Sequence, residues 1–521
     1  MPGAFFDPGV ERTTVASGDL TDELLQQPYW TEQMLTKAGI PIVDVPFVTV
    51  GGGMGSFAIV DYLRIAGVPT NKIKVLTAIE KPWTTYQHLT TVSQVPPGER
   101  LRSDSASCID NIWGFPSFAL REAAAAKGII KKLDPLWNVF TEPVLTNYFT
   151  PRAGQVFAGQ ANEANRIDWF SMVALGQVRM VRRRHGGGYF TILTPPLGTS
   201  DTKRVAYKSQ FVHVAIGYPG LRFLPDLQEY RTRTQDYVHV VNAYEPHDHV
   251  YEELLRMPGT VIVRGGGIAA SRILQRLTDD RDYRGAKTQI VHLFRTYVDG
   301  PTGDSIFWRR PGGDGWSYQG FNWPKAGWGG QIKVKLEHLE GEERKKYFDA
   351  MAGTTTPKRK LWMKQLARGR KEGWYKTYTG AVDSVVQGPG NTVTTRIKTK
   401  DGLLEIPANF IIDSTGLEAD IREHRVLADL LDFGGAEKNV LGKLSVSRSF
   451  EIVGTRNENG RMYAVGSATL GSYYSVVDSF LGVQAAGLAV ADDLAAQGFC
   501  QKIGFRRSIS QWWKWSLNRK V

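Results

Sequence analysis

Two stretches of the chain repeat one pattern of apolar and glycine positions. Residues 48–56 read VTVGGGMGS and residues 261–270 read VIVRGGGIAA, so each starts as an apolar β-branched run and continues into three glycines. This order predicts a short buried strand, a tight turn and a helix. A second apolar run follows each copy, at residues 75–80 (VLTAIE) and 290–295 (IVHLFR). The first of these runs ends in an acid and the second in a base.

The glycines have the spacing of a turn that holds a dinucleotide. Gly51 allows the tight strand-to-helix turn, Gly53 lets the backbone approach a pyrophosphate, and Ser56 is small enough for close helix packing. The phosphates would lie at the helix N-terminus, where unpaired N–H groups and the helix dipole favour negative charge. The second copy repeats the three positions with Gly265, Gly267 and Ala270. One glycine cluster is a weak signal, but strand, turn, helix and second strand together, twice, predict two nucleotide sites.

The residue that ends each second run predicts which nucleotide binds. Glu80 can accept hydrogen bonds from both ribose hydroxyls and would repel a 2′-phosphate, whereas Arg295 offers such a phosphate a permanent charge. The first site should therefore hold FAD or NAD, and the second should prefer NADPH over NADH. Arg272 and Arg276 would add to the positive field there, unless they are ordinary solvated helix charges.

With these two sites, the chain resembles the flavoproteins with two dinucleotide-binding domains. That superfamily includes flavin-containing and N-hydroxylating monooxygenases, disulfide reductases and peripheral NAD(P)H dehydrogenases, and the resemblance covers most of residues 45–495. Its members finish each half with a strand that runs into a glycine beside the cofactor. Residues 211–220 (FVHVAIGYPG) and 410–417 (FIIDSTGL) resemble these endings. The resemblance therefore implies cofactor contacts at Gly217 and Gly416.

A last flavin-binding segment is implied near the C-terminus. Residues 463–468 (YAVGSA) resemble the strand that ends at the ribityl chain, with Gly466 and Ser467 at the contact. Many members have an aspartate where this chain has Ser467. The helix that follows begins near Gly482 and would point its N-terminus at the flavin ring.

The loop at residues 96–103 (PPGERLRS) follows the ribose strand, where monooxygenase-like members run past the flavin. Arg100, Arg102 and Ser103 are candidates to face the ring or its phosphates. A solvated loop is an equally good interpretation.

The resemblance implies an α/β fold of two Rossmann-like, three-layer ββα domains, with the NAD(P)H domain inserted into a discontinuous FAD domain. The expected parts are an N-terminal extension with one short helix near residues 20–38 (1–45), the FAD domain (46–221 and 417–495), the NAD(P)H domain (222–416) with a long insertion (299–378), and a basic, Trp-rich tail (496–521). The insertion contains Trp308, Trp316, Trp323 and Trp328 among glycines, which suits a substrate lid or an interface loop.

Amino-acid composition limits the kinds of protein that this chain can be. The chain of 521 residues is 42% hydrophobic and 22% charged, without a secretory pattern or an apolar run long enough to span a membrane. Only two cysteines occur, Cys108 and Cys500, far apart in sequence. They cannot form the closely spaced pair of a disulfide reductase, and they suit the cytoplasm.

The net charge of +12 favours anionic partners but is not a nucleic-acid signal by itself. Basic residues are dense at residues 358–371 and 504–521, the latter with Trp512, Trp513 and Trp515. Tryptophan beside Lys and Arg is typical of membrane-surface helices, so the tail is a candidate for membrane-surface contact. The alternative is that these tryptophans cover a core groove or a subunit interface. The oligomeric state is not predicted.

These features predict an FAD-dependent oxidoreductase that takes hydride from NADPH and passes it to dioxygen, as a monooxygenase on a small organic substrate. One alternative is a peripheral-membrane NAD(P)H:quinone-type dehydrogenase, and another is a non-catalytic nucleotide-binding scaffold. The cofactors carry such chemistry, so no catalytic residue is named. The cluster of His247, Asp248 and His249 lacks further close ligands, so no metal site is predicted.

Overall fold

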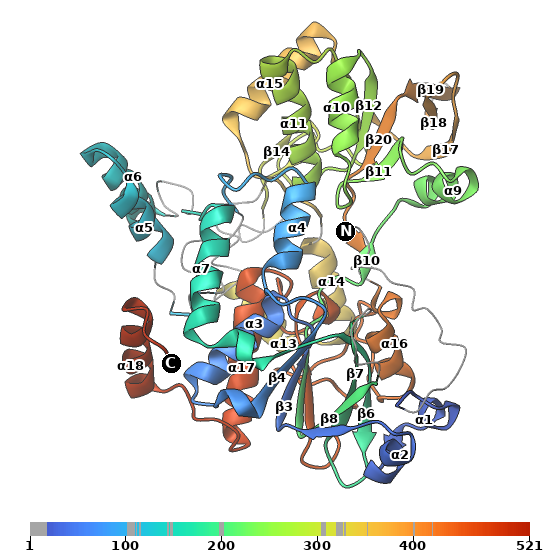
Figure 1. The fold of residues 1–521 in the computed structure, drawn as a ribbon. Helices are drawn as coiled ribbons and strands as arrows, with labels where there is room; N and C mark the ends of the chain where they lie inside the picture. The colour runs from blue at the N-terminus through green and yellow to red at the C-terminus, as the bar shows by residue number, and fades with distance from the viewer. Residues whose placement is uncertain are drawn as a thin grey trace.

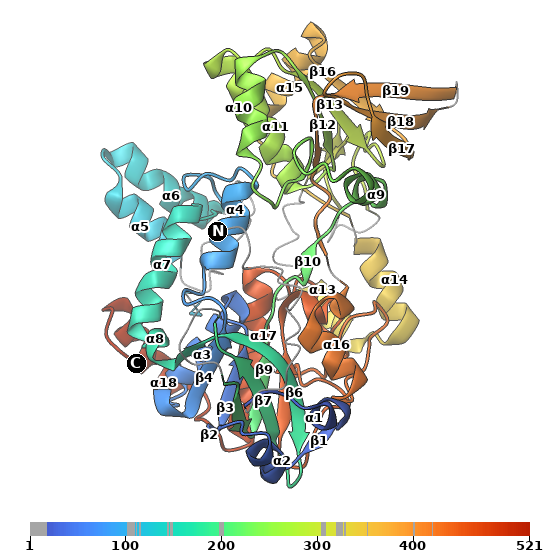
Figure 2. The ribbon, with the colours of Figure 1, turned by 45° about the vertical axis from the view of Figure 1, so that its right-hand side comes forward.

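The computed structural model describes residues 18–101, 110, 112–113, 116–142, 145, 149–196, 203–303, 309–318, 327, 330–351, 353–399, 402–418 and 420–521. Its two α/β halves stand one above the other (Figure 1), joined by a narrow connection (Figure 2). The predicted fold class is confirmed: each half has a parallel sheet with helices on one face and a second sheet packed nearby.

The lower half is built on a parallel sheet in the order β22-β9-β3-β4-β5. Its strands are β3 (Phe47–Val50), β4 (Ile73–Thr77), β5 (Val173–Leu175), β9 (Phe211–Val214) and β22 (Arg461–Ala464). Helices α3 (Met54–Ile65) and α17 (Phe480–Ala496) pack together beside it. Strand β9 pairs with both β3 and β22. The lower half is therefore built from chain segments that precede the upper half in sequence and from segments that follow it.

The second sheet of the lower half has the order β1-β6-β7-β8-β2. Its strands are β1 (Tyr29–Trp30), β2 (Ile42–Asp44), β6 (Gln177–Arg184), β7 (Tyr189–Thr194) and β8 (Val205–Ser209). The expected N-terminal extension thus contributes a strand at each edge of this sheet.

The prediction of one helix near residues 20–38 is wrong. Two helices, α1 (Asp22–Gln26) and α2 (Glu32–Lys37), lie there, with β1 between them. The Thr21 and Thr31 hydroxyls accept hydrogen bonds from backbone N–H groups of the first turns, so each helix has its own N-cap. Pro28 follows α1 and disfavours a helical conformation at the residue before it.

The upper half has a parallel sheet in the order β11-β20-β12-β13-β16. Its strands are β11 (Val240–Asn242), β12 (Thr260–Arg264), β13 (Gln289–Phe294), β16 (Tyr375–Thr379) and β20 (Phe410–Asp413). Its helices are α9 (Pro225–Thr234), α10 (Asp248–Arg256), α11 (Ile268–Arg284) and α15 (Lys360–Glu372). An antiparallel sheet adds β17 (Val382–Gln387), β18 (Val393–Thr399) and β19 (Gly402–Ala408).

The insertion expected at residues 299–378 ends earlier than predicted. It contains β14 (Gly312–Gly313), β15 (Trp316–Ser317), α13 (Gln331–His338) and α14 (Gly341–Met351). Helix α15 and strand β16 follow, and β16 pairs in parallel with β13, so both belong to the nucleotide fold itself. Trp316 is buried, whereas Trp308, Trp323 and Trp328 lie outside the described residues.

The remaining elements cover the lower half and its connection to the upper one. They are α4 (Thr84–Val92), α5 (Ser117–Ala125), α6 (Ile129–Thr141), α7 (Ala153–Arg166), α8 (Trp169–Met172), α16 (Arg425–Asp432), α18 (Phe505–Ser516), β10 (Gly220–Leu221), β21 (Leu417–Glu418), and the 3₁₀ turns η1 (Thr70–Lys72), η2 (Ile421–Glu423) and η3 (Gly466–Thr469). Among the described helices, none has the length and apolarity needed to cross a bilayer.

A charged cluster is buried between α3 and α7. Arg166 bonds to both carboxylate oxygens of Glu163, and its Nη2 lies 3.7 Å from Asp61 Oδ1. All three side chains are almost fully buried. Burial and the nearby Glu163 charge raise the pKa of Asp61 well above its usual value. One guanidinium therefore serves two buried carboxyl groups.

Because Asp110 is a further buried carboxyl group, we expect the free energy of unfolding to depend on pH. Burial raises its pKa to about 7, from 3.8. The unfolded chain releases this proton at lower pH than the folded protein, so the free energy of unfolding should fall as the pH rises between these values. From about pH 5 to pH 8 the loss should be about 2 to 3 kcal/mol larger in the wild type than in Asp110→Asn. Urea unfolding at both pH values measures it, and equal losses would contradict a raised pKa.

Candidate functional site

The first glycine turn is pressed against its neighbouring strands. Gly51 has φ +98°, and its N–H donates to the Leu76 carbonyl at 2.9 Å. A Cβ at Gly51 would overlap the carbonyl oxygen of Ala215, at the end of β9, and a Cβ at Gly52 would overlap the Thr77 side chain. The turn therefore excludes side chains on its inner side for reasons of backbone conformation and packing.

The outer side of the same turn is open. Gly53 is the N-cap of α3, and a Cβ there would meet no atom of the described residues within 4 Å. The first N–H groups of α3 face this space without intrahelical partners. Ser56 is buried, and its hydroxyl lies 2.8 Å from that of Thr49, which ties α3 to β3. The opening fits a pyrophosphate, whose charge the helix N-terminus would stabilise.

The second turn repeats this arrangement. Gly265 has φ +128°, and a Cβ there would lie 2.6 Å from the carbonyl oxygen of Ser414, at the end of β20. Gly267 is the N-cap of α11, and Ala270 is fully buried against the sheet. A Cβ at Gly267 would lie 3.6 Å from Thr354 Cβ, so a threonine side chain borders this helix N-terminus, which would still favour a pyrophosphate.

His292 supports the second turn, and sequence reasoning missed it. Its Nε2–H donates to the Gly265 carbonyl at 2.6 Å, and its Nδ1 lies 2.9 Å from the Tyr375 hydroxyl. Burial lowers its pKa to about 4, so the neutral ring holds the turn. The only signal in the sequence is a polar residue inside the apolar run of β13.

The charged residues that follow the two second strands are both exposed. Strand β4 ends at Thr77, and Glu80 lies beyond it with its carbonyl accepting from Trp169 Nε1 at 3.0 Å. Strand β13 ends at Phe294, and Arg295 follows directly. Within the described part of the chain, the Arg295 guanidinium has no hydrogen-bond or ion-pair partner. Both side chains can reach a ligand without breaking an existing contact.

Three glycines predicted as cofactor contacts border open space. Gly217, Gly416 and Gly466 all have positive φ, and within the described part of the chain a Cβ at any of them would meet nothing within 4 Å. The Ser467 hydroxyl donates to the Gly217 carbonyl at 2.6 Å, which joins the ends of β9 and β22. Gly482 differs, because a Cβ there would overlap the Val476 carbonyl oxygen, so it is needed for the packing of α17.

Arg100 was expected to be available to a flavin, but its guanidinium is already bonded to other residues of the protein. Its Nη2 lies 2.7 Å from Glu122 Oε1, its Nη1 donates to the Thr150 carbonyl at 2.6 Å, and its guanidinium lies over the Phe149 ring. The side chain therefore fixes the loop to the region before α7. Arg102 and Ser103 lie outside the described residues.

Arg272 and Arg276 were expected to add positive charge at the second nucleotide site, but in the structure they contact residues of the lower half. Arg272 is buried on α11, lies 3.1 Å from Glu99 and donates to the Gln94 carbonyl at 3.3 Å. Arg276 donates to the Gln94 side chain at 3.3 Å. Residues 94 and 99 belong to the lower half, so these arginines connect the two halves beside the second turn.

Breaking this connection should loosen the upper half relative to the lower half. In Glu99→Ala the buried Arg272 loses its carboxylate partner. We expect amide hydrogen exchange of the segment around residues 94–99 to become about tenfold faster, a change of about 1.4 kcal/mol in its opening free energy. Glu405→Ala removes the exposed Arg396–Glu405 pair, at 2.8 Å, and should leave the exchange rate unchanged. Equal exchange rates in both variants would contradict a connecting role.

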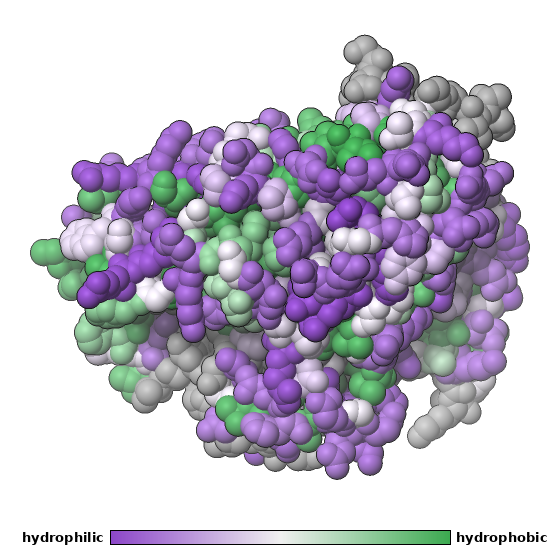
Figure 3. Space-filling model, turned by 90° about the horizontal axis from the view of Figure 1, so that it is seen from below, coloured by the Kyte–Doolittle hydropathy of each residue, from purple (hydrophilic) through white to green (hydrophobic). Residues whose placement is uncertain are grey.

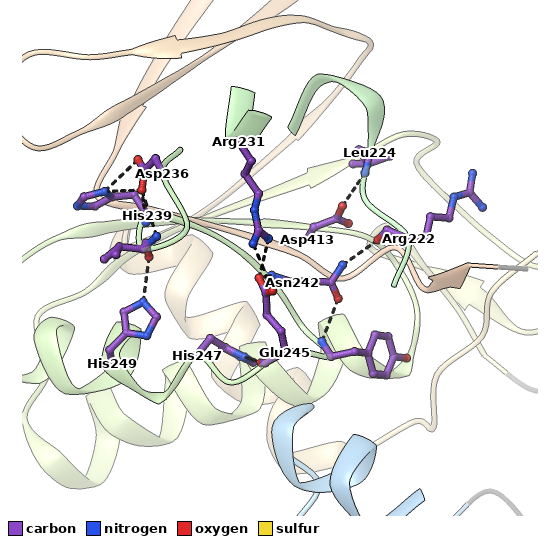
Figure 4. A network of polar contacts seen from close by, with 12 residues as sticks. Arg222, Leu224, Arg231, Asp236, His239, Asn242, Glu245, His247, His249 and Asp413 are labelled. Atoms are coloured by element: carbon purple, nitrogen blue, oxygen red, sulfur yellow. Dashed lines mark hydrogen bonds and ion pairs between the residues drawn. The ribbon is translucent and has the colours of Figure 1, made fainter. Parts of the chain in front are cut away.

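A second connection is a polar network at the ends of β11 and β20 (Figure 4). Asp413 accepts from the Leu224 N–H at 2.8 Å, and Asn242 donates to the Arg222 carbonyl at 2.7 Å. These bonds fix the segment that leaves β10 against the upper sheet. Strand β10 pairs with β21, so the two crossing segments are also bonded to each other.

The His247–Asp248–His249 cluster is used for local bonds. His247 Nε2 lies 2.9 Å from the Tyr251 hydroxyl, and His249 Nε2 donates to the Val238 carbonyl at 2.9 Å. No grouping of three His, Cys, Asp or Glu side chains suited to a metal occurs in the residues that the structure describes.

Neither a protein-family model nor a curated protein matches this chain. Solved structures match over most of it. Ornithine hydroxylase from Pseudomonas aeruginosa has 15% identity and a TM-score of 0.60, covering 87% of this chain and 100% of its own. A Kutzneria ornithine N-hydroxylase with reduced FAD, NADP+ and L-ornithine has 12% identity and a TM-score of 0.59. The match covers 87% of this chain and 99% of the hydroxylase. The FAD-bound cadaverine monooxygenase of Erwinia amylovora has 10% identity and a TM-score of 0.61. The match covers 88% of this chain and 96% of the monooxygenase.

At such identities the similarity concerns the fold, which agrees with the paired glycine turns and the inserted upper half. The chain has the fold of the flavoproteins with two dinucleotide-binding domains, as its glycine pattern predicts.

Proposed function

We propose that this protein is an FAD-dependent oxidoreductase that takes hydride from NADPH and acts as a monooxygenase on a small organic substrate. The observation that carries the proposal is the pair of glycine turns, each at a helix N-terminus, followed by an acid in one half and a base in the other. The three structural neighbours above are named for amine substrates, so a primary amine is the first substrate class to test.

In this proposal each half binds one cofactor. The α3 N-terminus at Gly53 holds the FAD pyrophosphate, and Glu80 accepts hydrogen bonds from its ribose. The α11 N-terminus at Gly267 holds the NADPH pyrophosphate, and Arg295 binds the 2′-phosphate. Bound FAD supplies hydride acceptance and reactivity towards dioxygen, while the protein orients the rings and excludes water.

The test is an anaerobic titration of the purified protein with NADPH, followed by admission of air. The proposal expects a yellow protein, loss of the oxidised-flavin absorbance with NADPH, and amine-dependent formation of an oxygenated product. A colourless protein that takes up no flavin overturns it. Bound cofactors without turnover of any acceptor would identify a nucleotide-binding scaffold instead.

A second candidate is a dehydrogenase that delivers electrons to a quinone at a membrane surface. It is favoured by α18 and its C-cap residue Leu517, where every fourth residue is a large, exposed apolar side chain: Phe505 81%, Ile509 45%, Trp513 56% and Leu517 55% exposed. No acidic residue follows Asp493, whereas six basic residues do. Along the left edge of Figure 3, where Figure 1 places α6 and α18, apolar and hydrophilic side chains lie together. Basic helices with an exposed apolar stripe bind anionic bilayers.

The two candidates differ in their response to surface variants of α18. Trp515 donates to the Asp110 carbonyl at 3.0 Å and anchors the helix, so it is left intact. The dehydrogenase predicts that Phe505→Ser with Trp513→Ser abolishes sedimentation with phosphatidylglycerol vesicles and quinone reduction, with flavin content retained. Absence of vesicle binding by the wild type would exclude it.

A further inference from the structure

One segment of the insertion lies against the first turn of α11. Residues 353–359 read GTTTPKR. The Thr356 hydroxyl donates to the Ser271 hydroxyl at 2.7 Å, and both residues are fully buried. Arg359 Nη2 donates to the carbonyl and the hydroxyl of Ser271, at 3.0 Å each. Ser271 is the fourth residue of α11, so the segment is bonded directly to the helix that begins at the second glycine turn.

The other end of the segment is also fixed. Arg310 donates to the Gly353 carbonyl at 3.2 Å and to the Met351 carbonyl. The Thr356 N–H donates to the Ser317 carbonyl at 3.0 Å, in a bridge between β15 and the segment. Thr354 lies between these attachments, so its position relative to α11 is set from both sides.

Thr354 stands beside the opening of the second turn. A Cβ at Gly267 would lie 3.6 Å from Thr354 Cβ and 3.7 Å from its Cγ2, and a Cβ at Gly266 would lie 3.9 Å from its Oγ1. The side chain is exposed. At the first turn, by contrast, a Cβ at Gly53 meets none of the described atoms within 4 Å. The insertion therefore places a threonine beside the second turn, with its carbon atoms nearest Gly267 and its hydroxyl nearest Gly266.

We propose that Thr354 is a phosphate-binding residue of the NADPH site, and that presenting it is one function of the insertion. Its hydroxyl, which lies nearest Gly266, would donate a hydrogen bond to a pyrophosphate oxygen. The inference rests on the proposed function, because it requires a dinucleotide at the second turn.

The geometry assigns Thr354 to the pyrophosphate and not to the 2′-phosphate. It faces Gly267, the N-cap at which a pyrophosphate lies. The base that suits a 2′-phosphate is Arg295, which follows the end of β13. NADP+ and NAD+ share the pyrophosphate, so both should depend on Thr354.

The test is calorimetric titration of the FAD-loaded protein with NADP+ and with NAD+, which measures equilibrium affinity and not activity. Thr354→Val should weaken both nucleotides by about tenfold, the usual scale for a hydrogen bond to a charged group. Thr354→Ser keeps the hydroxyl and should restore both affinities. Thr302→Val, at an exposed threonine elsewhere in the insertion, is the matched control and should change neither.

Each other outcome is decisive. If wild-type protein binds the nucleotides and Thr354→Val binds them equally well, the inference fails while the proposed function stands. A loss limited to NADP+ overturns the assignment to the pyrophosphate. If wild-type protein binds FAD but neither nucleotide, the second site of the proposed function fails, and this inference fails with it.

Discussion

Gly53→Ala is expected to give a folded protein that has lost FAD. The φ of Gly53 is −84°, which alanine adopts without strain, and among the residues that the structure describes the added Cβ meets no atom within 4 Å. The stability of the cofactor-free protein should therefore be unchanged. The methyl group would occupy the space into which the pyrophosphate must come, so FAD affinity should fall at least about tenfold. Flavin content after purification and fluorescence titration of the apoprotein measure the change.

Gly51→Ala is the contrasting variant in the same turn. Its positive φ and the overlap of a Cβ with the Ala215 carbonyl oxygen strain the folded state. We expect a loss of about 2 to 4 kcal/mol in unfolding free energy, together with loss of FAD. If Gly53→Ala retained full FAD affinity, the opening at α3 would not be a pyrophosphate site.

Arg166→Leu is expected to lower the free energy of unfolding by about 3 to 5 kcal/mol. The substitution leaves Asp61 and Glu163 buried without their shared guanidinium. Urea unfolding at neutral pH gives the change directly.

The same cluster supplies a control for that variant. Adding Asp61→Asn and Glu163→Gln to Arg166→Leu removes both buried carboxyl groups and should recover a large part of the loss, since the penalty comes mainly from uncompensated buried charge. A loss below about 1 kcal/mol in the single variant would show that water or relaxation reaches this cluster.

The two nucleotide turns could be predicted from sequence because their signals are local. A β-branched run followed by glycines fixes strand, turn and helix within a few residues, and both turns have the expected strand and helix. The positive φ values of Gly51 and Gly265 are a property that only glycine supplies easily.

The contacts that surround the turns could not be predicted, because their partners are far apart in the chain. Arg272 and the Gln94 carbonyl are separated by 178 positions, and nothing in either local pattern indicates the other. The Arg100–Glu122 pair is similar, since a loop arginine in an exposed-looking stretch has no sequence signal for a carboxylate on α5. The strands β1 and β2 were missed because two or three residues carry too little periodicity.

The pairing of β22 with β9 has a consequence for synthesis on the ribosome. The upper half is continuous in sequence and can complete its sheet once β20 has emerged. The lower half must wait, since β22 and α17 belong to its core and follow the upper half in the chain. Until then the side of β9 that β22 will cover is an open edge, with unpaired backbone groups. The nascent chain therefore holds a finished module between two unfinished pieces of another, and the sheet beside the first glycine turn is completed after the sheet beside the second.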